Sequence, residues 1–81
     1  MAQVKKRHHP ELAAVRAAAL GAFIRQARQR ADRTQEDVSA VSGLSVVHLQ
    51  RLERGTANPT VATLYRLADT LGVRVQELLL D

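Results

Sequence analysis

The stretch that decides the fold is 34-TQEDVSAVSGLSVVHLQRLERG-55, which carries the signals for two short helices and a tight turn between them. Thr34 is a typical N-cap residue, and Asp37 stands where it completes a capping box, with Asp in place of the usual Glu. Gly43 suits the left-handed conformation that ends a helix. Ser45 is the next N-cap. The spacing between the two caps fits a helix of about two turns followed by a steep bend, which predicts a helix-turn-helix.

The segment before this stretch also has a helical pattern. Pro10 suits the first position of a helix, with Glu11 near the positive end of the helix dipole. Apolar residues then recur at helical spacing as far as about Ala31. Gly21 interrupts the pattern, so this segment is either one long helix with a weak point or two shorter helices. Asp32 and the residue after it predict a turn, because Asp tolerates left-handed backbone.

After Gly55, Thr60 predicts the N-cap of a fourth helix that Gly72 ends, and residues 74–80 predict a short last helix. The inward positions of the two central helices are expected to be Val38, Val41, Leu49 and Leu52. No segment shows the alternation of a strand. The predicted fold is all-α, a compact bundle of four to five short helices. We expect residues 1–9 to form a basic arm, residues 10–81 a helix-turn-helix domain, and residues 34–54 the core of that domain.

Composition narrows the function classes. The chain has 81 residues, no cysteine and a net charge of +4, which fits either attraction to a polyanion or an ordinary solubility charge. Phe23 and Tyr65 are its only aromatic residues, which argues against modules that bind single strands or RNA by stacking. No phosphate-binding glycine loop, nucleophile elbow or zinc pattern occurs, so no enzyme, cofactor or metal is expected. His8 and His9 are too few for a metal site.

Neither a signal peptide nor an apolar run long enough to cross a bilayer is recognisable, so we expect a cytoplasmic protein.

A set of residues at fixed spacing runs from about Leu20 to Leu79. Its members are Ile24, Arg25, Arg28, Thr34 to Val38, Gly43 to Ser45, Leu49, Glu53, Gly55, Asn58 to Thr60, Leu64, Leu67, Ala68, Leu71 to Val73 and Leu78. In this pattern the chain resembles the lambda-repressor-like, Cro-type helix-turn-helix family, also called the xenobiotic-response-element type. The resemblance implies double-stranded DNA as partner, and a recognition helix at about residues 45–54 that enters the major groove.

The resemblance also implies roles for single residues. Arg28 and Glu53 form a buried ion pair between the first and third helices, which is a structural role. Gln35 binds a phosphate at the start of the second helix, where free N–H groups point at the same anion. The alternative is that it is an exposed capping residue. The full expected DNA-contacting set is Gln35, Ser45, Val46, Val47, His48, Gln50, Arg51, Arg54, Thr56 and Asn58.

Within this set the expected contacts differ. Arg51 suits a bidentate pair with guanine, and Val46 and Val47 suit thymine methyl groups. Alternatively, Val47 packs on the second helix and Val46 is a tolerated surface residue. His48 is either a contact or a surface residue. Arg54, Thr56 and Asn58 are expected to touch the DNA backbone. The arginines expected to be plain surface charges are Arg25, Arg30, Arg66 and Arg74.

Three positions depart from the family pattern. Arg33 replaces an apolar residue, so the bend before Thr34 could pack differently. Ser39 replaces an alanine and is small enough to fit. Arg74 stands where Ser or Thr would cap the last helix, so that helix is either frayed or supported by a partner chain. The basic arm of residues 1–9 is expected either to reach the DNA or to be a solvated tail.

The function that these features predict is a sequence-specific transcriptional regulator, either repressor or autoregulator. It would act as a homodimer on an inverted repeat, because one helix reads too few bases. The apolar C-terminus supplies the expected dimer surface, and intramolecular packing on the fourth helix is the alternative for these residues, which are Val75, Leu78, Leu79 and Leu80. A second reading is an antitoxin-type regulator whose main partner is a toxin protein.

Overall fold

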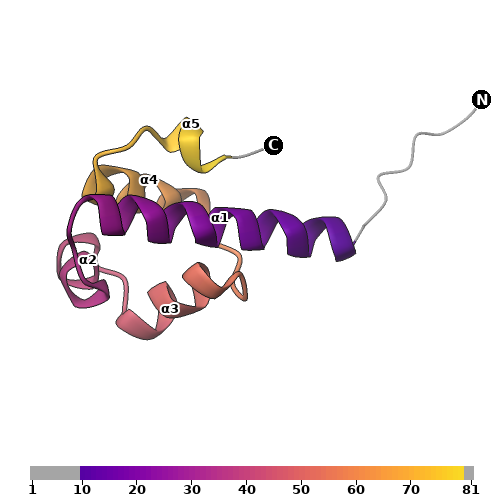
Figure 1. Ribbon diagram of the computed structural model, residues 1–81, viewed down its shortest axis with the longest axis horizontal. Helices are drawn as coiled ribbons and strands as arrows, with labels where there is room; N and C mark the ends of the chain where they lie inside the picture. Colours follow the sequence, from indigo (N-terminus) through magenta and orange to yellow (C-terminus); the bar gives the residue numbers. More distant parts are fainter. Residues whose placement is uncertain (1–9, 80–81) are drawn as a thin grey trace, which may run out of the picture.

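The computed structural model describes residues 10–79 and forms five helices in that range. The basic arm of residues 1–9 and Leu80 lie outside the described residues. The helices are α1 (Pro10–Arg30), α2 (Gln35–Ser42), α3 (Val46–Arg54), α4 (Val61–Leu71) and α5 (Val75–Leu78). Figure 1 shows α2 and α3 on one side of the long helix α1 and α5 on the other side, while α4 lies behind α1 and packs against α2. The described part of the chain contains no strand, so the all-α prediction is confirmed.

Helix α1 is continuous, so the alternative of two shorter helices is wrong. Gly21 lies where α1 meets α3. A Cβ atom at this position would lie 2.3 Å from the carbonyl oxygen of Leu52 and 2.6 Å from that of Glu53. The glycine that weakens the helical pattern is therefore the residue that lets two backbones touch. The N-terminal turns of α1 extend beyond the other helices (Figure 1).

The helix ends follow the local signals in the sequence. The side chain of Thr34 accepts a hydrogen bond from the N–H of Asp37 at 3.0 Å, and Asp37 Oδ2 accepts one from the N–H of Thr34 at 3.0 Å, which is the predicted capping box. Ser45 Oγ accepts from the N–H of His48. Asp32 has a φ of 57° and Gly43 a φ of 81°, the left-handed backbone expected at both turns. These caps satisfy backbone groups that a helix leaves unpaired at its ends.

The core lies between the helices and is built from apolar side chains of all five. The largest fully buried ones are Ile24, Val38, Leu49, Leu52, Leu67 and Leu78. The expectation that Val41 faces inward is wrong, because its side chain is 64% exposed. Helix α2 packs through residues 35, 38, 39 and 42, which form one stripe of the helix, and Val41 falls beside that stripe.

The C-terminal helix packs on its own chain. Leu78 is 2% exposed and belongs to the core, which corrects its assignment to a dimer surface. Val75 is half-buried against the same core, whereas Leu79 is 56% exposed. Arg74 offers no side-chain cap to α5, but Glu77 Oε2 accepts from the N–H of Arg74 at 2.9 Å. The start of α5 is therefore supported from within the chain.

None of the helices in residues 10–79 has the combined length and apolar character to span a membrane.

Candidate nucleic-acid interface

Helix α3 has one exposed face and one buried face. Leu49 and Leu52 are 0% and 1% exposed and anchor the helix in the core. Val47, Arg51 and Arg54 follow the spacing i, i+4, i+7 and are all exposed, so they share the opposite face. A helix with two anchored leucines presents such a face rigidly, as a recognition helix must.

The remaining α3 candidates lie at the flanks of this face. Val46, His48 and Gln50 are half-buried, and Ser45 is exposed. Val47, at 55% exposure, is therefore the valine that lies open to a partner, while Val46 is partly covered. An exposure of 55% fits both a DNA contact and partial packing of Val47 on α2, so both readings stay predictions.

An ion pair locks α3 to α1. Arg28 Nε lies 2.7 Å from Glu53 Oε2, and Arg28 Nη2 lies 3.1 Å from Glu53 Oε1. The two side chains are only 13% and 5% exposed. The hydrogen bond with Glu53 raises the pKa of the Arg28 guanidinium above its ordinary value. The ion pair implied by the family pattern is present, and both of its charges are paired, as burial requires.

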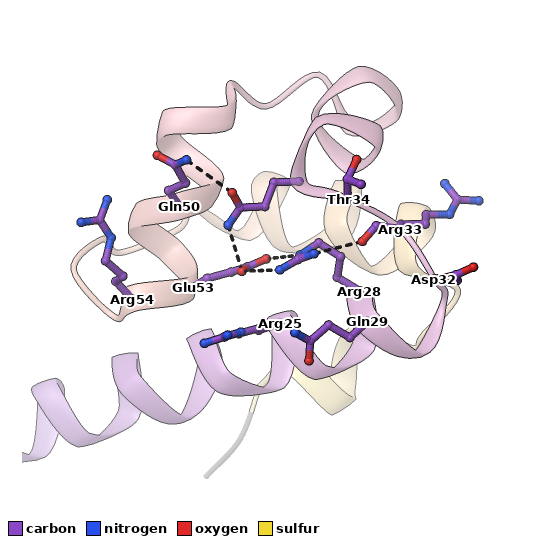
Figure 2. Close-up of a pocket in the computed structure, with 10 residues that line it drawn as sticks. Arg25, Arg28, Gln29, Asp32, Arg33, Thr34, Gln50, Glu53 and Arg54 are labelled. Carbon is purple, nitrogen blue, oxygen red and sulfur yellow. Dashed lines mark hydrogen bonds and ion pairs between the residues drawn. The ribbon is translucent and has the colours of Figure 1, made fainter.

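Gln35 joins the same network. Its Nε2 donates to Glu53 Oε1 at 3.1 Å, and its Oε1 accepts from Gln50 Nε2 at 3.4 Å (Figure 2). The amide of Gln35 therefore points toward α3, and a phosphate contact by this side chain remains a prediction. Sequence reasoning missed the contact with Glu53, because residues 18 positions apart carry no joint local signal.

Two serines and one arginine hold the bends on either side of α2. The hydroxyl of Ser39 donates to the carbonyl of Leu44, and Ser42 Oγ accepts from the N–H of Leu44 at 3.2 Å. Arg28 Nη1 donates to the carbonyl of Arg33 at 3.0 Å. Both departures from the family pattern in this region are thus accommodated. Ser39 adds a polar tie to the turn, and the bend at Arg33 is fastened through its backbone.

The loop after α3 carries the last two candidates. Thr56 donates its hydroxyl and its N–H to the carbonyl of Arg51, at 3.1 Å and 2.9 Å. Thr56 and Asn58 are exposed. Thr56 thus closes the end of α3 and stands at the surface beside the recognition face, where a DNA backbone contact is geometrically possible.

A pocket of about 700 Å³ lies beside this face, between α1, the start of α2 and α3. The network of Arg28, Glu53, Gln35 and Gln50 forms part of its lining, and Arg25 and Arg54 also line it (Figure 2). Sequence reasoning treated Arg25 as a plain surface charge. Only the crossing of α1 and α3 brings it to the flank of the recognition helix.

Comparison with known proteins identifies the family to which this chain belongs. The sequence model of the helix-turn-helix family HTH_3 matches residues 24–78, and the chain belongs to this Cro-type family. The match takes in the two central helices, the ion pair and α5. The resemblance stated from the sequence is confirmed.

Relatives of known sequence carry matching names. The chain is 49% identical over 59 residues to the "uncharacterized HTH-type transcriptional regulator y4dJ" of Sinorhizobium fredii, covering 73% of this chain and 77% of that protein. It is 39% identical over 56 residues to the HTH-type transcriptional regulator DdrOP3 of Deinococcus deserti, covering 69% of this chain and 43% of that protein. The chain therefore spans less than half of the second relative.

Solved structures show the same fold. The restriction-modification controller protein C.AhdI of Aeromonas hydrophila is similar with a TM-score of 0.74 and 27% identity, covering 76% of this chain and 94% of that one. The clp gene regulator ClgR of C. glutamicum has a TM-score of 0.73 and 30% identity, covering 79% and 83%. The chain is a transcriptional regulator with a helix-turn-helix DNA-binding domain, in a class of DNA-binding proteins and not of enzymes.

Proposed function

We propose that this regulator binds a specific duplex sequence by placing α3 in the major groove, and that it acts as a homodimer on an inverted repeat to repress transcription. The observation that carries the proposal is the exposed face of Val47, Arg51 and Arg54 on a helix anchored by two buried leucines and one buried ion pair. We expect it to act in the bacterial cytoplasm.

The side chains on that face indicate which edges of the DNA bases they would contact. Arg51 is exposed and can present its guanidinium to O6 and N7 of a guanine. Val47 offers an apolar surface to a thymine methyl group, which accounts for an exposed valine in an otherwise polar region. Val46, His48 and Gln50 border the same face and would contact the base edges at its margins.

Backbone contacts would fix the position of α3 in the groove. Arg54, Thr56 and Asn58 stand at the C-terminal end of α3, and Gln35 and Ser45 stand near the starts of the two central helices. Contacts at both ends hold the register of a recognition helix without reading sequence.

A homodimer would double the number of bases read. Two recognition helices about one helical turn of DNA apart would contact the half-sites of an inverted repeat. Leu79 is exposed and lines an apolar pocket of about 320 Å³. The rest of the lining comes from α1, from the loop before α4, and from α4 and α5. This supports a partner surface at the C-terminal end, to which Val75 and Leu80 would add.

Fluorescence anisotropy with the duplex upstream of the chain's own gene and a scrambled duplex tests the proposal. Wild type should bind the upstream duplex more tightly, and Arg51→Ala should remove that preference, a loss of about 1–3 kcal/mol for one bidentate base contact. Arg66→Ala, an exposed change on α4, is the matched control and should keep the preference. Equal affinity of wild type for both duplexes at every salt concentration would contradict specific readout of this site.

A further inference from the structure

The pocket beside α3 has a floor whose polar groups are already paired. Both carboxylate oxygens of Glu53 accept hydrogen bonds, from Arg28 and, at Oε1, also from Gln35. Gln35 in turn accepts from Gln50. The carboxylate oxygens of Glu53 are therefore already hydrogen-bonded, so Glu53 is a poor partner for a further arginine at the rim of the pocket.

The rim carries two arginines that have no such partner. Arg25 on α1 and Arg54 in the last turn of α3 are both exposed, and within residues 10–79 neither side chain forms an ion pair or a hydrogen bond. Figure 2 shows Arg25 on α1 below Glu53 and Arg54 at the end of α3, with Asp32 on the opposite side of the pocket from Arg54. The rim thus concentrates positive charge on the flank of the recognition helix.

The crossing of α1 and α3 places both arginines on the rim of one pocket. Gly21 allows the α1 backbone to approach the carbonyl oxygens of Leu52 and Glu53, which precede Arg54 directly. Arg25 follows Gly21 by one helical turn.

The shape of the guanidinium group indicates the ligand. Its planar fork of donors matches the oxygens of a phosphate group. Arg54 shares the exposed face of α3 with Val47 and Arg51. When this face lies in a groove of DNA, the strand at the edge of that groove passes the rim of the pocket. We propose that Arg25 binds a backbone phosphate of the DNA at the rim of this pocket, in addition to the contact proposed for Arg54. The inference rests on the proposed DNA binding and adds Arg25 to its contacts.

The salt dependence of binding tests the inference. Each phosphate contact contributes about 0.9 to the slope of log affinity against log salt concentration. When the salt concentration rises from about 50 to 200 mM, the affinity of Arg25→Gln should therefore fall by a factor roughly 3.5 times smaller than the affinity of wild type. The same reduction is expected on the upstream and the scrambled duplex, because a phosphate carries no sequence information.

Two further variants control for charge. Arg30→Gln removes the same charge from the exposed surface of α1 outside the pocket and should keep the wild-type slope. Arg25→Lys keeps the charge and should restore most of the slope. Thermal unfolding of Arg25→Gln should match wild type, since the exposed side chain has no partner to lose; a purely structural role would lower the midpoint.

The outcomes separate this inference from the proposed function. An unchanged slope for Arg25→Gln, or a change on one duplex alone, would overturn the phosphate site while wild-type binding stands. A slope change equal to that of Arg30→Gln would also overturn it, because only net charge would then matter. If wild type binds neither duplex at low salt, the proposed function itself fails.

Discussion

Two largely helical regions of this molecule are held together differently. The polar corner, residues 21–55, joins the second half of α1 to α2 and α3 through a backbone contact at Gly21 and a buried ion pair. The outer end, residues 11–19 of α1 together with α5, presents exposed apolar side chains, with Leu12 at 42% and Val15 at 63%. Helical pattern predicted both regions, but only contact between helices gives the corner its rigidity.

One ion pair from the corner and one at the start of α5 show the same contrast. Arg28 and Glu53 are 13% and 5% exposed, whereas Arg74 and Glu77 are 81% and 42% exposed with their charged atoms 3.8 Å apart. Burial strengthens the attraction between two charges and raises the cost of leaving one unpaired. The comparison therefore predicts unequal effects for similar substitutions.

The largest effect is expected for Glu53→Ala. It leaves the Arg28 guanidinium buried and unpaired and frees Gln35, so the free energy of unfolding should fall by about 3–5 kcal/mol. Glu77→Gln in the exposed pair should cost less than about 1 kcal/mol. Urea unfolding followed by circular dichroism measures both. Equal losses for the two variants would refute the contrast between the regions.

Gly21→Ala should come second. Alanine in a helix gains about 1 kcal/mol over glycine, but the new Cβ would lie 2.3 Å from the carbonyl oxygen of Leu52, a backbone atom that cannot rotate away. Overpacking of this kind costs about 3 kcal/mol, so a net loss of about 2 kcal/mol is expected in the free energy of unfolding. Ala14→Leu, an exposed change in the outer end, is the control and should stay within about 0.5 kcal/mol. A stabilised Gly21→Ala variant would show that α1 and α3 do not touch.

The smallest effect is the acid sensitivity of the α2 cap. Hydrogen bonds from the backbone N–H of Thr34 and with its side chain lower the pKa of the Asp37 carboxyl below its usual value. A lowered folded-state pKa contributes stability that is complete above the unfolded value of about 3.9 and is lost as the pH falls through the folded value. Asp37→Asn should therefore flatten the decline of stability with acid, measured by urea unfolding at a series of pH values, and a decline as steep as in wild type would contradict this role of Asp37.

The sequence by itself determined the features that depend on neighbours within one turn. Thr34, Ser45 and Thr60 cap their helices, Gly43, Gly55 and Gly72 end them in left-handed backbone, and Asp32 makes the bend. Hydroxyl caps and left-handed turns are governed by contacts three or four residues apart, so local residue types predict them. The spacing of these signals also predicted the ion pair, through the resemblance to a family.

Tertiary structure alone decided which of several apolar or polar faces is used. In the folded chain Val41 is exposed, Leu78 lies in the core, and the side chain of Gln35 donates a hydrogen bond to Glu53. It also made Gly21 a point of backbone contact and placed Arg25 beside the recognition helix. Each of these outcomes depends on where a second helix packs, and that position follows from contacts between residues far apart in the chain, which no local pattern records.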